Sequence, residues 1–410
     1  MNLLLIHQNF PGQFRQLVGA WIASGHSVVA LGERPLSIPA EAFTYLAYGS
    51  ILPPQQRFPE GPLDEAIELA LRRGWRVAEA CRDLRQQGYI PDALVVHSSW
   101  GEALHVREIW PKAVLLAYPE IYGSRACMGM DLDPDHEPIN DGLVAAIERR
   151  NMLALAAIQV ADAAVVPTAF QRSTFPLAVQ ERLHVIHEGV NTELVAPNPA
   201  SAVEVGDGLV LRPGDPVVTF ASRHLEPLRG FSQLIKALPA LLHAHPSVQV
   251  LIAGHLHGQG YGPASTHPGG HAAALLDAYG SRIDWQRVHL LGALPYPDLL
   301  ALFQVSAVHV HLTYPYTLSW SVLEAMACGA AVVGSASAPL TDLIHHEHNG
   351  LLVPFQDEGA LAAAILRLLL DRRRRDRLAQ AARSTVEHSF GLERCSTAYL
   401  QLITQLRESR

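Results

Sequence analysis

The sequence predicts an α/β protein with two lobes, each a parallel sheet covered by helices. Short, almost wholly apolar runs of a strand's length recur along the chain, and most are followed by a longer segment with helical spacing. The chain has 410 residues, of which 49% are hydrophobic, and this is ample for two or three domains with large cores.

The first lobe opens with a buried strand, and the order of its elements follows from the apolar runs. The pattern predicts the strand Leu3–Ile6, a loop with Pro11 and Gly12, the helix Arg15–Ser24, the strand Ser27–Leu31, the helix Leu63–Gln87, the strands Ala93–Val96 and Val114–Ala117, the helix Asn151–Val160, the strand Ala164–Val166 and a helix starting in Pro167–Phe175. Residues 36–60 have several prolines and no sustained period, so we expect an extended loop there.

The second lobe restarts the same alternation after residue 201. The pattern predicts the strand Pro216–Phe220, the helix Ser232–Ala244, the strand Val248–Ala253, an irregular insertion over 255–270, the strand Val288–Leu291, the helix Tyr296–Val305, the strand Val308–Leu312, a helix from Ser321, the strands Ala330–Val333 and Leu351–Val353, and the helix Glu358–Leu370. A last helical pair reaches Arg410, and Tyr399, Leu402 and Ile403 give its end an apolar face for docking.

Net charge, cysteine spacing and apolar run length exclude several classes of protein. A formal net charge of -8 argues against a nucleic-acid binder, because phosphate backbones are bound by clustered Lys and Arg. We interpret the basic run Arg372–Arg375 as a solvated helix end, with contact to anionic lipid or a partner as the open alternative. The scattered cysteines indicate neither zinc nor a disulfide framework, so we expect a cytoplasmic protein. No apolar run reaches about 18 residues, which leaves only peripheral contact with the inner membrane face open.

The segment Val308–Ser335 passes from strand to loop to helix to strand, and we place the active site there. The N-terminus of such a helix faces the carboxyl edge of a parallel sheet and attracts a phosphate, with Ser319 or Ser321 as the N-cap. Glu324 lies about one turn into the helix, where it can accept hydrogen bonds from a sugar or ribose hydroxyl pair. The alternative is a surface carboxylate near a helix N-terminus.

Two arginines follow the first strand of the second lobe. Arg223 and Arg229 stand beside the start of a helix, where two guanidiniums can grip a diphosphate with forked hydrogen bonds. Such donors also stabilise the charge that develops on a leaving nucleoside diphosphate. Two surface charges are the alternative.

Polar residues also follow strands of the first lobe. His97 is a candidate base or hydroxyl donor, and Glu120 a candidate for binding sugar hydroxyls or orienting an acceptor. A structural histidine and a surface acid are the alternatives. Two further groups invite a metal, Asp131, Asp133 and Asp135 in one loop and His255, His257 and His267 in another. We expect solvated loop acids, a mobile histidine loop and no metal.

Several segments resemble the retaining glycosyltransferases of family 4. "LEAMACGAAVVGS" and "NGLLVPFQDEGALAAAI" are similar to their nucleotide-sugar half, "SRHLEPLRGF" to their "GR…KG" segment, and "VIHEGVNTELVAPNP" to their hinge. The resemblance implies the GT-B fold, with two Rossmann-like α/β/α domains facing a central cleft. The implied division is 1–195 for the acceptor-side domain, 196–385 for the nucleotide-sugar domain, and 386–410 for a helix that crosses back.

The resemblance also implies roles for individual residues. Arg223 matches the family's arginine and Arg229 its lysine, Glu324 would bind the ribose, and the turn with Gly292 and Leu294 the base. The remaining donor contacts implied are Gly12, from the glycine loop across the cleft, and Tyr316, Leu318, Ser319 and Ser321. The family's first glutamate, eight residues before Glu324, is Tyr316 here, and Glu120 stands where many relatives have a histidine-glycine pair.

The function implied is transfer of a sugar, with retention, from a nucleotide-diphosphate sugar to an acceptor hydroxyl in glycan, polysaccharide or glycoconjugate synthesis. The acceptor would be a saccharide, a lipid-linked or a protein hydroxyl, and no cofactor beyond the donor is expected. A GT-B epimerase or phosphorylase and a non-catalytic sugar-nucleotide-binding protein remain as alternatives.

Overall fold

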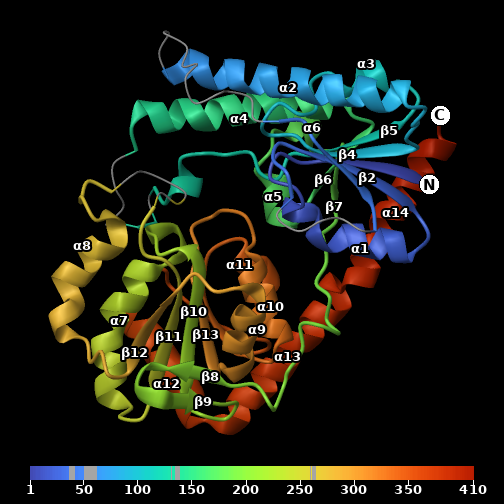
Figure 1. Cartoon of the computed structure of the whole chain (residues 1–410). Coiled ribbons are helices and arrows are strands. Elements are labelled where there is room, and N and C mark those ends of the chain that lie inside the picture. The colour runs from blue at the N-terminus through green and yellow to red at the C-terminus, as the bar shows by residue number, and fades with distance from the viewer. Residues whose placement is uncertain (37–41, 50–61, 131, 134–138, 259, 261–264) are drawn as a thin grey trace. The chain divides into compact units, whose positions relative to one another are not determined.

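The computed structural model describes the chain except residues 37–41, 50–61, 131, 134–138, 259 and 261–264 (Figure 1). The chain forms two compact units, each with a parallel sheet, which confirms the predicted α/β class. Unit 1 comprises Met1–Ser124, Asp141–Gly189 and Phe390–Arg410, and unit 2 comprises Arg125–Asn140 and Val190–Ser389. The sequence-based division at residue 195 differs by a few residues, and it assigned residues 125–140 to the first domain.

Among the described residues, the sheet of unit 1 has seven strands in the order β3-β2-β1-β4-β5-β6-β7. They are β1 (Asn2–Ile6), β2 (Ser27–Gly32), β3 (Thr44–Ala47), β4 (Ala93–His97), β5 (Val114–Tyr118), β6 (Ala163–Val166) and β7 (Leu183–Val185). Strand β3 lies where we expected only a loop. It is a four-residue edge strand paired with β2, too short and too exposed to show the burial pattern of a central strand.

The side chains of β1 alternate between two cores, as the period of a strand requires. Leu3 and Leu5 pack with Trp21 of α1 (Arg15–Ala23) and Tyr399 of α14 (Leu392–Glu408). Leu4 and Ile6 belong to the opposite core. That core includes residues of α2 (Pro62–Gln86), α3 (Val106–Ile109) and α4 (Asp141–Val160), and the shorter helices α5 (Ala169–Ser173) and α6 (Leu177–Gln180) follow later in the unit.

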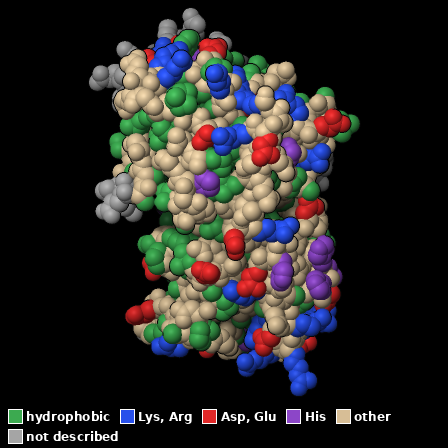
Figure 2. All heavy atoms as spheres, turned by 90° about the vertical axis from the view of Figure 1, so that its right-hand side faces the viewer, with side chains coloured by type: hydrophobic (Ala, Val, Ile, Leu, Met, Phe, Trp, Pro, Cys, Tyr) green, Lys and Arg blue, Asp and Glu red, His purple; other side chains and the backbone are tan. Residues whose placement is uncertain are grey.

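Acidic and basic side chains are interspersed on the face of the molecule that Figure 2 shows. Among the described residues of that face, no extended patch of one sign is visible. The four cysteines of the chain are buried and not in disulfides.

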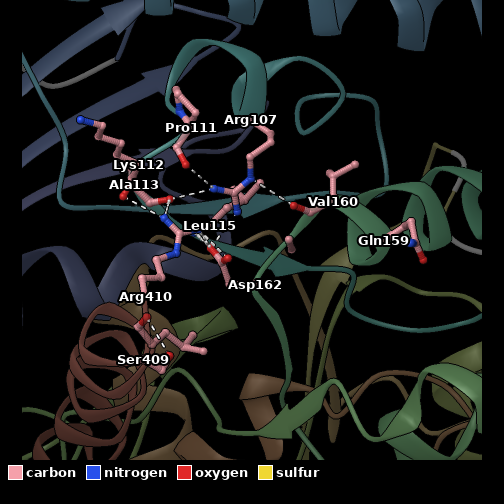
Figure 3. Close-up of polar contacts among 12 residues, drawn as sticks. Arg107, Pro111, Lys112, Ala113, Leu115, Gln159, Val160, Asp162, Ser409 and Arg410 are labelled. Atoms are coloured by element: carbon pink, nitrogen blue, oxygen red, sulfur yellow. Dashed lines mark hydrogen bonds and ion pairs between the residues drawn. The ribbon is translucent and has the colours of Figure 1, made fainter.

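The end of α14 is fixed to unit 1 through Asp162 (Figure 3). Arg410 donates to Asp162 Oδ2 at 2.6 Å and to the Ala113 carbonyl at 2.9 Å, and Arg107 donates to the same carboxylate at 2.7 Å. The backbone N–H of Leu115 is a further donor, also at 2.7 Å. Burial opposes ionisation, but these donors together lower the pKa of Asp162 below its usual value. The last helix therefore belongs structurally to unit 1.

The sheet of unit 2 has six strands in the order β12-β11-β10-β13-β14-β15. They are β10 (Val217–His224), β11 (Gln249–His255), β12 (Val288–Gly292), β13 (Val308–His311), β14 (Ala331–Ser335) and β15 (Leu351–Val353), and β8 (Val203–Val205) and β9 (Leu209–Leu211) form a separate antiparallel pair. The helices are α7 (Phe231–Ala244), α8 (Gly270–Tyr279), α9 (Tyr296–Val305), α10 (Trp320–Ala327), α11 (Leu340–Leu343), α12 (Glu358–Leu370) and α13 (Arg372–Phe390).

The basic run Arg372–Arg375 forms the first turn of helix α13, so it is a helix end as we interpreted it, and Arg372 and Arg373 are exposed. The backbone N–H of Arg374 donates to the Asp371 carboxylate at 3.0 Å, so this aspartate caps a new helix. Three arginines of the run pair with acids, Arg372 with Asp376 at 3.4 Å, Arg374 with Glu347 at 3.5 Å and Arg375 with Asp376 at 3.6 Å. Within the part of the chain that the structure describes, no helix is both long and apolar enough to span a bilayer.

Both sheets reverse their strand order beside their first strand. The chain goes from β1 outward through β2 and β3, and then returns to place β4 on the other side of β1. In unit 2 the reversal lies between β10 and β13. Ligands of open α/β sheets bind at the carboxyl ends of the strands at such a reversal, because the two connections diverge there.

Buried neutral histidines make the stability of the fold dependent on pH. His309 of β13 is 0% exposed, and its Nδ1 lies 2.9 Å from Thr219 Oγ1. Burial lowers the pKa of His309 to about 3, so between that value and 6.5 the unfolded chain binds a proton that the folded chain does not. Stability is therefore lost as the pH falls below 6.5.

We predict that His309→Leu reduces this acid destabilisation. The wild type should lose about 2 kcal/mol at this residue alone between pH 7 and pH 5, and the variant should not. Urea unfolding at the two pH values measures the difference, with His348→Leu at an exposed histidine as the control. An equal pH dependence in wild type and His309→Leu would contradict a neutral His309.

Candidate functional site

Two arginines lie at the β10 side of the strand reversal in unit 2. Arg223 is exposed and sits within β10, which runs four residues further than predicted, with a register shift between Ala221 and His224. Arg229 ends the short 3-10 turn η4 (Pro227–Arg229) and is 9% exposed. Its guanidinium donates to Thr313 Oγ1 at 2.9 Å and to the Thr317 carbonyl at 3.3 Å. Arg229 is therefore no surface charge, because it is built into the loop after β13.

The loop after β13 is fixed from two directions. Thr313 N donates to Ser335 Oγ at 3.0 Å, and Ser337 Oγ donates to the Thr313 carbonyl at 2.7 Å. On its other side, Tyr314 N donates to the Leu228 carbonyl at 2.9 Å. These bonds hold the loop against both β14 and η4.

The start of α7 comes so close to β13 that it needs a glycine. Gly230, the N-cap of α7, has φ 74, and a Cβ there would lie 2.4 Å from Leu312 Cβ. A side chain at residue 230 would therefore push the helix N-terminus away from the strand end.

The N-terminus of α10 lies at the end of the same loop. Ser319 is the N-cap, but its Oγ pairs with Ser321 Oγ at 2.8 Å and makes no side-chain cap to the helix backbone. Tyr316 and Leu318 are buried, while both serines are half-buried. The N-cap side chain of α10 therefore does not bond to the first turn of the helix, and the backbone N–H groups of such a turn are favourable to an anion.

Glu324 is buried inside unit 2, at 4% exposure. Its Oε1 accepts a hydrogen bond of 2.8 Å from the hydroxyl of Tyr296, the first residue of α9. The alternative of a surface carboxylate is therefore wrong. Burial, together with the charge of Glu324, raises the pKa of the Cys328 thiol to about 12.

A cavity of ≈ 300 Å³ lies at the carboxyl ends of β10 and β11. Its lining includes His224, Glu226, His255, His257, His267 and His271. Within the described residues, no group of three or more His, Cys, Asp or Glu side chains has a geometry that could hold a metal ion. The predicted base-binding turn is near the carboxyl end of β12, where Gly292 is the last strand residue and Leu294 is half-buried.

The acidic loop that we expected to be solvated is only partly described. Asp131 and Asp135 lie outside the described residues. Asp133 is 3% exposed and accepts a hydrogen bond of 2.6 Å from the hydroxyl of Tyr314. The expectation of a solvated acid is therefore wrong for Asp133, because a buried tyrosine hydroxyl needs a partner and takes this one.

The strand reversal in unit 1 carries acidic and imidazole groups. His97 is the last residue of β4 and is buried, and Glu120 follows β5. Glu120 Oε2 lies 3.7 Å from His97 Nε2, and Glu120 Oε1 accepts a hydrogen bond of 2.9 Å from Gln13. Burial would raise the pKa of Glu120, but the hydrogen bond and charge of His97 and the Gln13 bond outweigh it and lower that pKa.

Sequence reasoning missed His7, which completes this group. It is the first residue after β1 and is 4% exposed, and its ring centroid lies 4.5 Å from that of His97. Gly12, predicted as a donor contact, has φ 47, and a Cβ there would lie 2.4 Å from His7 Nε2. The glycine thus makes room for the imidazole. The sequence signal that could have identified His7 as a site residue is its position directly after the apolar run Leu3–Ile6.

An α/β chain with two such sheets and polar groups at both reversals has the architecture of a two-domain nucleotide-binding protein. A family profile described as "Glycosyl transferase family 4 group" matches residues 24–195, and "Glycosyl transferases group 1" matches residues 209–385. The two profiles together span most of the chain. The chain belongs to this family of glycosyltransferases, as the sequence motifs predicted.

Curated relatives match about half of the chain. D-inositol 3-phosphate glycosyltransferase of Kribbella flavida is 28% identical over 211 residues, which are 51% of this chain and 47% of the relative. The enzyme of the same name from Mycobacteroides abscessus is 29% identical over 217 residues, 53% of this chain and 44% of the relative. The matched stretch thus spans under half the length of these relatives.

Solved structures match the whole chain and confirm the predicted GT-B fold. Sucrose-phosphate synthase from Thermosynechococcus elongatus has a TM-score of 0.74 at 21% identity, covering 100% of both chains. HepE from Anabaena, solved in complex with UDP and glucose, has a TM-score of 0.68 at 17% identity, covering 99% of this chain and 100% of that one.

We predict that Arg229→Met destabilises the protein and that Arg223→Met does not. Losing the buried guanidinium leaves Thr313 and the Thr317 carbonyl without this donor, at a cost of about 1–3 kcal/mol. The same change at the exposed Arg223 should cost less than about 0.5 kcal/mol. Urea unfolding measures both, and equal stabilities would contradict a structural role for Arg229.

Proposed function

We propose that this protein is a retaining glycosyltransferase that moves a sugar from a nucleoside diphosphate sugar to an acceptor hydroxyl. One observation carries the proposal: Arg223, Arg229, the first turn of α10 and Glu324 all belong to the elements that meet at the β10 and β13 strand ends of unit 2. Each group has the chemistry of one part of such a donor.

The two arginines and the N-terminus of α10 fit the diphosphate of the nucleotide sugar. Both guanidiniums are permanently charged, and Arg229 is already oriented by Thr313 and Thr317. When the bond from the sugar to the diphosphate breaks, negative charge grows on the leaving oxygen. Preoriented cationic donors stabilise that charge most in the transition state, and this accelerates transfer.

The ribose, the base and the sugar of the nucleotide sugar are bound by other residues of unit 2 in this proposal. Glu324, oriented by Tyr296, binds the ribose hydroxyls, and the turn with Gly292 and Leu294 holds the base. Tyr316, Ser319 and the backbone after Leu318 contact the sugar and its phosphate, with the tyrosine hydroxyl in place of a carboxylate. Because an uncharged group contacts the sugar there, its selection rests more on shape than on charge.

The acceptor in this proposal is a saccharide, lipid-linked or protein hydroxyl, bound by unit 1 in the cytoplasm. Contact with an anionic membrane face belongs to the proposal only for a lipid-linked acceptor. No nucleic-acid partner is proposed, because a formal net charge of -8 does not favour binding to a phosphate backbone. The donor is a substrate, and no other cofactor is proposed.

We expect UDP to bind the wild type and Arg223→Met to weaken that binding by about 2 kcal/mol, the scale of a charge-assisted hydrogen bond. Calorimetry measures the affinity, and the stability of Arg223→Met separates lost contact from lost fold. A panel of nucleotide sugars, assayed for free nucleoside diphosphate and for epimerised sugar, then tests the reaction. Epimerised donor without diphosphate release, or binding without turnover, would replace the proposal with an epimerase or a binding protein.

We expect turnover to survive exhaustive chelation. The two arginines supply the positive charge that a divalent ion supplies in other sugar transferases, so the leaving diphosphate is already neutralised in part. The measurement is diphosphate release with and without EDTA. Loss with EDTA and recovery with Mg²⁺ or Mn²⁺ would contradict this expectation and bring Asp131, Asp133 and Asp135 back as candidates.

A further inference from the structure

Glu120 has a backbone conformation that side chains other than glycine rarely adopt. Its φ is 63, in the left-handed region, and among the described non-glycine residues only Glu347 shares a positive φ. Both ends of the residue are held in place. The side chain of Gln171, which is 0% exposed in α5, donates to the Glu120 carbonyl at 2.9 Å, and Gln13 donates to its carboxylate at 2.9 Å. A strained residue held this firmly points to function.

The amide of Gln13 is itself oriented by His7. The backbone N–H of Asn9 donates to His7 Nδ1 at 2.9 Å, so Nδ1 is an acceptor and the ring proton resides on Nε2. That N–H donates to Gln13 Oε1 at 2.6 Å, which turns the NH₂ group of Gln13 toward Glu120. Only one tautomer of His7 and one orientation of Gln13 satisfy the whole series.

This arrangement persists over the physiological pH range. Burial, followed by the charge of His97, lowers the pKa of His7 to about 3, so its ring stays neutral. The groups that face Glu120 are His7, Gln13, Gln171 and His97, and none of them is an acid. Burial raises the pKa of Glu102, against the charges of His97 and Arg73, whereas the pKa of Glu120 is lowered, so ionisation is more favourable at Glu120 than at Glu102.

We propose that Glu120 orients the acceptor by accepting a hydrogen bond from the attacking hydroxyl, and that His7 and Gln13 are its positioning residues. The Glu120 side chain is 27% exposed, and Gln13 donates to Oε1. Oε2 lies 3.7 Å from His97 Nε2, which is beyond hydrogen-bond distance, so Oε2 can still accept a hydrogen bond from a substrate. Because the group is an anion, it selects a neutral hydroxyl over one that has a phosphate beside it. The inference rests on the proposed glycosyltransferase function.

Glu120 orients the acceptor hydroxyl and does not act as a general base. A carboxylate whose pKa is lowered is a weak base and a good hydrogen-bond acceptor. The acceptor oxygen bonds to the anomeric carbon, and the bond from that carbon to the diphosphate oxygen breaks, with its electron pair staying on the diphosphate. The hydroxyl proton passes to the departing diphosphate. The protonation state of Glu120 is therefore the same before and after the transfer.

The test uses the full chain, water as the acceptor, and the nucleotide sugar from the donor panel that gives the fastest diphosphate release. Glu120→Gln should lower kcat at least about tenfold while the donor KM and the UDP affinity stay within about twofold, since the lost interaction belongs to the acceptor. Normal release by Glu120→Gln overturns the proposal. No release by the wild type with any donor contradicts the proposed function itself.

Glu120→Gly separates function from folding. Glycine adopts the φ of residue 120 without strain, so this variant should unfold at a higher urea concentration than the wild type and still show the reduced kcat. Lower stability together with lower kcat would mark Glu120 as a structural residue and overturn the proposal.

The positioning role of Gln13 has its own readout. Gln13→Met removes an N–H that helps to lower the Glu120 pKa, so the carboxylate protonates at higher pH and the acidic limb of the pH profile of kcat should move to higher pH. Gln16→Met, the same chemical change three residues further along, is the control and should retain the wild-type profile. A Gln13→Met profile that superimposes on the wild type overturns the positioning role.

Discussion

The constraint on which both units depend is the reversal of strand order beside the first strand of each sheet. Helices cover both faces of a parallel sheet, so its functional polar side chains lie in the loops at the strand ends. At the reversal, two such loops diverge and leave room for a ligand. In unit 1 this places His7 after β1 near His97 at the end of β4. In unit 2 it joins η4 after β10 to the loop after β13 through Arg229 and Tyr314. The same topology thus positions two different sets of side chains.

The elements that the sequence predicted well are those whose burial is complete. Leu3–Ile6 is apolar at every position because both faces of β1 are covered, and the periodic helices Tyr296–Val305 and Glu358–Leu370 have the predicted bounds. Strand β3 was missed because an edge strand of four residues lacks that pattern. The basic run at 372–375 was predicted as a helix end but not as the start of α13, since the cap at Asp371 is a single hydrogen bond that periodicity does not show.

The candidate site was predictable by residue type and less so by environment. We selected Arg223, Arg229, His97 and Glu120 as candidates because they follow predicted strands. In the structure all of them lie at the carboxyl ends of strands. Burial was not predictable, because it depends on partners far along the chain. Glu324 accepts a hydrogen bond from Tyr296, and Asp133 accepts one from Tyr314, which is 181 residues away in the sequence. The roles of these residues stay predictions until binding and turnover are measured.

The two reversals carry different polar groups, and this difference follows from a few side chains. In unit 2 Arg223 and Arg229 lie at the end of β10 and just after it, and Arg229 directly precedes the start of α7. Cationic groups and helix starts are favourable to anions. In unit 1 the donors Gln13 and His97 surround a carboxylate and hold it ionised, which suits a neutral hydrogen-bond donor and disfavours an anion. One fold therefore carries cationic groups and helix starts on one sheet and an ionised carboxylate on the other. The residues that begin each loop, and not the sheets themselves, decide which is which.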